Sequence, residues 1–187
     1  PSPKYTPEIA ERCVKEIFQP TVAALKAEGR PFKGVIYFGL MLTKDGPKVV
    51  EYNARFGDPE TQPILSMLDT DLMDIFQACV DGTLDKVNIK WKSGAACCLV
   101  LASGGYPVSY KSGYPISGLA EAEALGATVF HAGTKKSDSG EILTAGGRVL
   151  GVTATAPSLE EAITAAYAAA KPISFQDMHF RTDIGKV

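Results

Sequence analysis

Three polar side chains at alternate positions, Glu51, Asn53 and Arg55, form the pattern with the clearest chemical meaning in this chain. On a β-strand, alternate side chains share one face, so the carboxylate, the amide and the guanidinium would project into one site. Carboxylate and amide oxygens are the hard ligands that Mg²⁺ favours, and a guanidinium offers a planar fork of donors to phosphate oxygens. The row therefore predicts a site for a polyphosphate bound with magnesium.

The opposite face of the same segment carries Val50, Tyr52, Ala54 and Phe56, which are apolar enough to pack on a core. An ordinary half-buried antiparallel strand with one solvated side would also show alternation of apolar and polar residues. That alternative does not account for the choice of a carboxylate, an amide and a guanidinium. The magnesium-phosphate interpretation does account for it.

A β-hairpin is the element that must position this row. Residues 35–43 and 48–53 are rich in strand-forming residues, and Lys44-Asp45-Gly46-Pro47 lies between them. Asp-Gly between two such runs is a strong hairpin signal. The polar row therefore lies on the second strand and leads into a loop at Gly57-Asp58-Pro59.

Helices are expected on both sides of this hairpin in the sequence. Thr6-Pro7-Glu8 has the residue types of a helix start, and Pro20 should break or kink the helix that follows. A second helical piece is expected over 21–28. A further helix is expected over 71–80, with Gly82 as its stop.

The character of the chain changes after Trp91, where glycine-rich loops separate short apolar runs. We expect strands at 95–102, 128–132 and 149–154, a short helix at 120–125, and a helix that starts at the capping box Ser158-Leu159-Glu160-Glu161 and ends near Ala170. We therefore divide the chain into an α+β part, residues 1–90, and a mainly β part, residues 91–187.

Charge and hydropathy disfavour nucleic acid and membrane as partners. The formal net charge is −2, and the lysines and arginines are dispersed rather than clustered. The longest apolar runs, such as 95–102, are too short to span a bilayer, and Pro1-Ser2-Pro3-Lys4 lacks the apolar core of a signal peptide. We expect a soluble intracellular protein.

The four cysteines show no metal-ligand spacing, and with two histidines in the chain a zinc site is disfavoured. Cys97 and Cys98 are adjacent in an expected strand, so their side chains point to opposite faces and do not suit a shared disulfide. The sequence predicts buried, reduced thiols.

Several motifs, in this order and spacing, resemble the C-terminal part of the glycinamide ribonucleotide synthetase family, also called phosphoribosylamine-glycine ligase, within the ATP-grasp superfamily. They are Tyr5-Thr6-Pro7-Glu8, Arg30-Pro31-Phe32-Lys33-Gly34-Val35, Glu51-Tyr52-Asn53-Ala54-Arg55-Phe56-Gly57-Asp58-Pro59-Glu60, Gly105-Tyr106-Pro107, His131-Ala132-Gly133-Thr134 and Gly146-Gly147-Arg148-Val149-Leu150. The resemblance covers practically the whole chain.

The resemblance implies an α+β fold: the second half of an ATP-grasp domain, an antiparallel sheet with helices, followed by a smaller mainly β domain of the rudimentary hybrid-motif type. It also implies a cytoplasmic enzyme of de novo purine synthesis. The family joins glycine to 5-phosphoribosylamine through a glycyl phosphate, with ATP as co-substrate and Mg²⁺ or Mn²⁺ as the metal, and releases ADP and phosphate.

The resemblance assigns metal binding to Glu51 and Asn53, and contact with the transferred phosphoryl group to Arg55. For Arg55, a structural ion pair with Asp58 or Glu60 is the alternative. The strand before the turn carries no further acidic ligand, so only two protein ligands are expected. Leu40 or Met41 would cover one face of adenine, or else belong to the core.

Three further roles concern the acceptor substrate. Asp58 would orient an amine, although a simple Gly-Asp-Pro turn also explains it. Gly147 and Arg148 would hold the ribose 5-phosphate, because glycine backbone allows a close approach and arginine donates two parallel hydrogen bonds. His131 would line the same pocket, or serve as a structural hydrogen-bonding residue.

The family's complete ligase is about twice as long as this chain and places its nucleotide-gripping lysines in a preceding half. The resemblance therefore implies that the upstream half of the same ligase is a required partner and that this chain alone lacks ligase activity. Two alternatives remain: another ATP-grasp ligase or carboxylase with a different acceptor, and a non-catalytic binding module.

Overall fold

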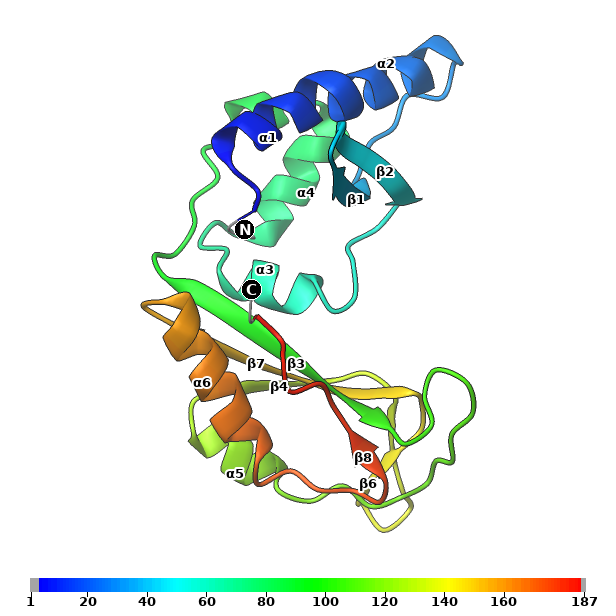
Figure 1. Cartoon of the computed structure of the whole chain (residues 1–187), viewed down its shortest axis with the longest axis vertical. Coiled ribbons are helices and arrows are strands. Elements are labelled where there is room, and N and C mark those ends of the chain that lie inside the picture. The colour runs from blue at the N-terminus through cyan, green and yellow to red at the C-terminus, as the bar shows by residue number, and fades with distance from the viewer. Residues whose placement is uncertain (1–3, 186–187) are drawn as a thin grey trace. The chain divides into compact units, whose positions relative to one another are not determined.

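The structure, a computed structural model, describes residues 4–185 and contains two compact units (Figure 1). Unit 1 comprises the described residues up to Gly57 together with Asp71–Asn88. Unit 2 comprises Asp58–Thr70 and the described residues from Ile89 onward. The division thus differs from a single boundary near residue 90, because residues 58–70 pack with the C-terminal unit. The mixture of helices and antiparallel sheets confirms the α+β class.

Unit 1 begins with helix α1, Pro7–Cys13, whose N-cap Thr6 accepts a hydrogen bond from the Ile9 amide at 3.3 Å. A π-helical turn, Val14–Phe18, follows directly, and α2 then runs over Gln19–Ala27. The expected break at Pro20 does not occur. Helical structure runs without interruption from Pro7 to Ala27, and the π-helical turn directly before Pro20 is the place where the regular α-helical hydrogen bonding changes.

The predicted hairpin is confirmed. Strands β1, Tyr37–Thr43, and β2, Gly46–Asn53, pair antiparallel around a two-residue loop. The register pairs Gly39 with Glu51 and then Leu40 with Val49, so Val50 is the extra residue of a β-bulge. The bulge changes the simple alternation of side chains along β2.

The prediction that Val50 and Tyr52 pack on a core is wrong. Val50 is 65% exposed and Tyr52 is 56% exposed. The hairpin has only two strands, and a two-stranded ribbon buries little surface by itself. The Tyr52 ring still meets the Phe38 ring edge-on, with 5.4 Å between centroids.

Helix α4, Leu72–Asp81, confirms the expected helix in this region. The Asp71 carboxylate accepts from the Met73 amide at 2.8 Å as the N-cap, and Gly82 ends the helix with a φ of 70°. The buried residue of this helix is Ala78, which is 7% exposed, whereas Phe76 and Val80 are exposed.

Unit 2 is built on an antiparallel sheet in the order β4-β7-β3-β8, as Figure 1 shows. Its strands are β3, Ala95–Ser103; β4, Thr128–His131; β7, Arg148–Ala156; and β8, Met178–His179. Helix α5 covers Leu119–Ala124, and α6 covers Leu159–Ala170 after the predicted capping box. The three expected strands and both expected helices are confirmed.

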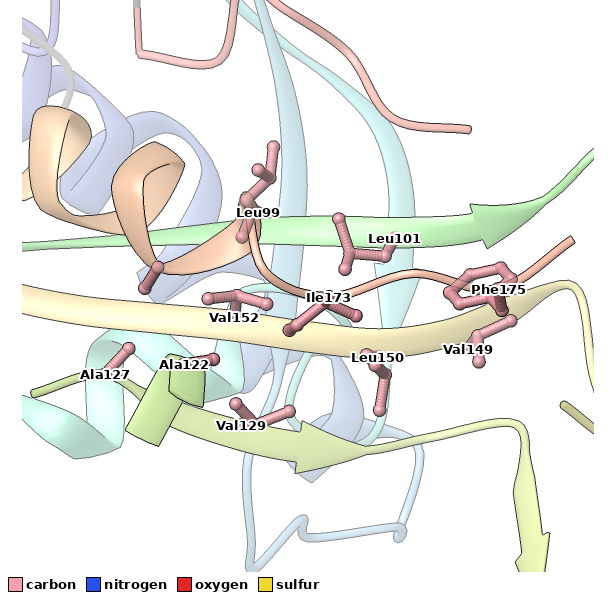
Figure 2. Close-up of a cluster of buried hydrophobic side chains, with 12 residues drawn as sticks. Leu99, Leu101, Ala122, Ala127, Val129, Val149, Leu150, Val152, Ile173 and Phe175 are labelled. Carbon is pink, nitrogen blue, oxygen red and sulfur yellow. The ribbon is translucent and has the colours of Figure 1, made fainter. Parts of the chain in front are cut away.

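The core of unit 2 lies between one face of this sheet and helices α5 and α6 (Figure 2). Leu99, Leu101, Val149 and Val152 are fully buried in it. Burying a leucine or valine side chain contributes about 1.5–3 kcal/mol, so this cluster is a major source of stability for the unit.

Five short elements are present that the sequence patterns did not predict. They are α3, Thr61–Ser66; a 3₁₀ turn, Leu84–Lys86; β5, Thr134–Lys136; β6, Ile142–Thr144; and β8. Helix α3 packs against β3 and β7. Among residues 4–185, no helix is long and apolar enough to cross a membrane.

Three of the four cysteines have the predicted form. All four are free thiols, and Cys13, Cys97 and Cys98 are buried, whereas Cys79 is half-buried. Cys97 packs with Ala162 and Ala166 of α6, while Cys98 lies across from Thr153 on the face toward α3. The two neighbours therefore point to opposite faces of the sheet.

Candidate functional site

In unit 1, the side chains of Glu51 and Asn53 lie together. Asn53 Nδ2 donates a hydrogen bond to Glu51 Oε1 at 3.1 Å. This contact confirms that the two groups share one face of β2. Because the amide nitrogen makes the bond, Asn53 Oδ1 and Glu51 Oε2 take no part in it.

The pair suits a magnesium or manganese ion. Both groups present hard oxygen donors, and Glu51 is exposed to solvent. Mg²⁺ is commonly held by one or two protein oxygens, with phosphate oxygens and water completing its octahedron. Among the residues that the structure describes, no three His, Cys, Asp or Glu side chains cluster to form a separate metal site. The two-ligand expectation is consistent with this arrangement and stays a prediction.

Arg55 does not continue the row. Strand β2 ends at Asn53, so the alternation of a strand no longer governs the side chain two residues later. Arg55 Nη1 instead donates to the Phe56 carbonyl at 2.8 Å. The prediction that Arg55 projects with Glu51 and Asn53 from one strand is therefore wrong.

A largely apolar hollow of about 360 Å³ adjoins Asn53 in unit 1. It is lined by Thr21, Leu25, Phe32, Ile36, Tyr52, Asn53 and Ala54. Leu40 is half-buried and Met41 is 57% exposed on β1, and neither lines this hollow. Their assignment to adenine stays a prediction.

In unit 2, Asp58 and Arg148 form an ion pair. Arg148 Nη1 lies 3.2 Å from Asp58 Oδ2 and also donates to the Asp58 backbone carbonyl. Arg148 Nε donates to the Tyr106 hydroxyl at 3.0 Å. The hydrogen bond to Tyr106 raises the pKa of Arg148, and the nearby Asp58 and Glu60 carboxylates act in the same direction.

This pairing relates two residues that the sequence assigned to separate tasks. Asp58 was expected to orient an amine and Arg148 to hold a phosphate, and the alternative for Arg55 was an ion pair with Asp58 or Glu60. The ion pair that the structure shows for Asp58 is with Arg148, ninety positions along the chain. No local sequence pattern indicates such a distant contact.

Gln62 and Tyr106 complete this group of side chains, and the sequence patterns gave Gln62 no role. Gln62 Nε2 donates to Asp58 Oδ1 at 3.0 Å, so both carboxylate oxygens of Asp58 are engaged. Its position four residues after Asp58 was the available signal. Tyr106 lay in a quoted Gly-Tyr-Pro motif without an assigned task.

Gly147 has a packing role beneath Tyr106. It is buried, and a side-chain carbon on it would lie 2.1 Å from Tyr106 Cδ2. Its carbonyl accepts from the Ser103 amide at 2.8 Å, and the Gly146 carbonyl accepts from Ser103 Oγ at 2.8 Å. The structure explains this glycine through close packing, and its contact with substrate stays a prediction.

His131 makes the contact that the structural alternative predicted. It is exposed at the end of β4, and its Nδ1 lies 3.0 Å from the Thr134 hydroxyl. That bond connects the last residue of β4 to the first residue of β5.

Two sequence models of known protein families match the chain. The model described as the ATP-grasp (A) domain of phosphoribosylglycinamide synthetase matches residues 1–61, and the model described as its C domain matches residues 96–187. The chain is therefore of the ATP-grasp class, with part of an ATP-grasp domain followed by a C domain. It belongs to the phosphoribosylglycinamide synthetase family.

Individual relatives agree. The chain is 51% identical to the phosphoribosylamine–glycine ligase of Vibrio parahaemolyticus over 99% of its own length and 43% of that protein. It is 49% identical to the ligase of the same name from Synechocystis, over 99% of its own length and 44% of that protein. The chain thus spans less than half the length of these relatives.

A solved structure supports the fold. The crystal structure of phosphoribosylamine–glycine ligase from Thermotoga maritima superimposes with a TM-score of 0.83 at 32% identity. The match covers 96% of this chain and 44% of that chain.

Proposed function

We propose that this chain is the C-terminal part of an ATP-dependent ligase that joins glycine to 5-phosphoribosylamine, giving glycinamide ribonucleotide, ADP and phosphate in de novo purine biosynthesis. Membership of the family supports the reaction. The adjacent Glu51 and Asn53 side chains support a nucleotide-linked metal site in unit 1. This pair is the observation that carries the proposal.

The chemistry explains why such groups are needed. A carboxylate is a poor electrophile, so ATP must first convert the glycine carboxylate into a glycyl phosphate with a good leaving group. Glu51 and Asn53 would hold Mg²⁺ or Mn²⁺ through Glu51 Oε2 and Asn53 Oδ1. When bound there, the ion would neutralise charge on the ATP phosphates during phosphoryl transfer.

Arg55 would contribute a positive charge near the transferred phosphoryl group. In the structure its guanidinium is exposed and bonded to the Phe56 carbonyl. Exchanging one exposed hydrogen bond for a phosphate contact has a small net cost. Arg55 therefore serves this role after a side-chain rotation.

Asp58 and Arg148 would act on the amine-bearing substrate. The Asp58 carboxylate is an acceptor for an ammonium or amine, and it is 48% exposed although both oxygens are engaged. The bonds of Arg148 to Tyr106 and Asp58 run through Nε and Nη1, which leaves Nη2 for an anionic group such as the ribose 5-phosphate. The pair thus offers both charges that an amine-bearing phosphate ester requires.

The partners follow from this assignment. They are ATP, glycine, 5-phosphoribosylamine and the preceding half of the same ligase, in the cytoplasm. The relatives are more than twice as long as the segment that matches, so the chain alone would lack the groups that grip the nucleotide. We expect no ligase activity from residues 1–187 by themselves.

The test compares three proteins: the complete ligase that contains this chain, the same ligase with Asp58→Asn, and the chain alone. Glycine and phosphoribosylamine should yield glycinamide ribonucleotide, identified by mass, together with ADP in the first. Asp58→Asn should raise the KM for the amine substrate or lower turnover. Absence of this product from the folded complete ligase would refute the function, and product from the chain alone would refute the need for a second half.

A further inference from the structure

The Asp58 carboxylate is held from two sides by side chains of two separate elements. Gln62, from α3, donates to Oδ1 at 3.0 Å, and Arg148, from β7, lies 3.2 Å from Oδ2. We infer that Gln62 and Tyr106 are positioning residues that fix the Asp58–Arg148 pair for the amine substrate. This inference rests on the proposed function, because it assumes that Asp58 receives an amine.

Gln62 is half-buried and lies against the sheet, because α3 packs on β3 and β7. A side-chain carbon on Gly151 of β7 would be 3.7 Å from Gln62 Nε2 and 3.2 Å from Cys98 Sγ. The 3.7 Å separation is an ordinary van der Waals contact, so the Gln62 amide lies directly against the backbone of β7 at residue 151. Packing of this kind restricts an amide more than solvent would.

The oxygen of the same Gln62 amide has an unusual environment. Gln62 Oε1 is buried and has no hydrogen-bond partner among the described residues. A methionine of similar length would fill this space without burying an unpaired acceptor, and burying one is unfavourable. What the amide adds is its hydrogen bond to Asp58, so this bond is the feature that requires glutamine here.

Tyr106 restricts Arg148, the second side chain that holds Asp58. Its ring occupies the space above Gly147, and its hydroxyl accepts from Arg148 Nε. Because hydrogen bonds hold the planar guanidinium at both Nε and Nη1, the orientation of its plane is fixed. Tyr106 therefore fixes the direction in which Arg148 presents Nη1 to Asp58 and Nη2 to a ligand.

A fixed Asp58–Arg148 pair would control the orientation of the amine substrate. An amine must be held at hydrogen-bond distance and in line with the glycyl phosphate carbonyl, and a misplacement of about 1 Å can cost on the order of a hundredfold in rate. A carboxylate anchored at both oxygens keeps a constant position when the amine arrives. Gln62 and Tyr106 would act only through Asp58 and Arg148, without touching substrate.

The test uses the complete ligase with Gln62→Met, Gln62→Glu and Tyr106→Phe. The matched control is Gln77→Met, because Gln77 Nε2 also donates to an aspartate four residues away, Asp81, at 3.0 Å on exposed helix α4. We expect Gln62→Met and Tyr106→Phe to lower kcat/KM for the amine substrate by roughly 10- to 100-fold. The KM for ATP and the melting temperature should stay near those of the parent.

Gln62→Glu separates positioning from space filling. It keeps the shape but places a second carboxylate against Asp58 Oδ1, so it should impair amine use more than Gln62→Met does. Gln77→Met should match the parent throughout. Parental kcat/KM in folded Gln62→Met and Tyr106→Phe would overturn the inference and leave the ligase function intact, whereas an inactive parent would refute the proposed function instead.

Discussion

Glu51 lies directly across the hairpin from Gly39, and a side-chain carbon at residue 39 would lie 2.7 Å from Glu51 Cγ. The Glu51 side chain therefore crosses β1 at a place where the partner strand has no side chain. This position brings Glu51 Oε1 within 3.1 Å of Asn53 Nδ2. The geometry of the predicted metal pair thus depends on a glycine of the neighbouring strand.

The first prediction follows from this contact. Gly39→Ala should push the Glu51 side chain away from Asn53. The contact is with Cγ, which is close to the backbone and can move away only if the whole side chain moves. In the complete ligase, Mn²⁺ affinity measured by EPR should fall by roughly tenfold or more, as when a supporting residue of a metal site is lost. Lys44→Ala, in the exposed hairpin loop, is the control and should bind Mn²⁺ as the parent does. Unchanged affinity in Gly39→Ala would show that Glu51 is not a ligand in this position.

The second prediction concerns Arg148. Arg148→Lys keeps the charge but loses the planar fork that contacts Tyr106 and Asp58 together. We expect kcat/KM for phosphoribosylamine to fall roughly tenfold or more while the KM for ATP changes little. Steady-state kinetics of the complete ligase would measure both constants. A lysine variant with parental kinetics would mean that charge alone suffices at this position.

The third prediction concerns the core of unit 2. Leu99 is fully buried among Leu101, Val152 and other apolar side chains, as Figure 2 shows. Leu99→Ala should lower the free energy of unfolding by about 2–5 kcal/mol, because it removes buried methyl groups and leaves a cavity. Val108→Ala, at a side chain that is 92% exposed, should change it by less than about 0.5 kcal/mol. Urea titration would measure both, and equal losses would contradict this description of the core.

The fourth prediction is a pH dependence at Cys98. Burial raises the pKa of the Cys98 thiol from 9.0 to about 11, because the thiolate is disfavoured away from water. A group whose pKa is raised in the folded state contributes stability that is complete below its unfolded pKa. That contribution is lost as the pH rises through the folded value near 11.

The measurement is the free energy of unfolding under reducing conditions at about pH 8 and about pH 10.5. Other groups also titrate in this window, so the useful quantity is the difference between the parent and Cys98→Val. The parent should lose more stability than the variant over this range. An equal loss in both proteins would mean that the Cys98 thiol does not titrate as its burial implies.

Much of the fold could be predicted because its signals are local. The Asp-Gly turn between two strand-forming runs indicated the β1–β2 hairpin, and Ser158 with Glu161 indicated the start of α6. Asp71 and Gly82 similarly bounded α4. In each case, the residues that mark the boundary of the element lie within it or directly beside it in the sequence.

What the sequence did not predict depends on neighbours that are distant in the chain or on geometry at the ends of elements. Arg55 was placed in the polar row because alternation was extended two residues beyond the true end of β2. The bulge at Val50 and the π turn before Pro20 insert single residues, which periodic patterns cannot register. The Asp58–Arg148 pair joins segments ninety positions apart.

The central claim is that Glu51 and Asn53 bind the metal of a nucleotide, and one measurement tests it directly. The complete ligase would be crystallised with Mn²⁺ and a non-hydrolysable ATP analogue, and the metal would be located by its anomalous signal. We predict a peak about 2.1–2.2 Å from a Glu51 carboxylate oxygen and from Asn53 Oδ1, with phosphate oxygens on its far side. A fully bound nucleotide whose metal is coordinated by other residues would contradict the account.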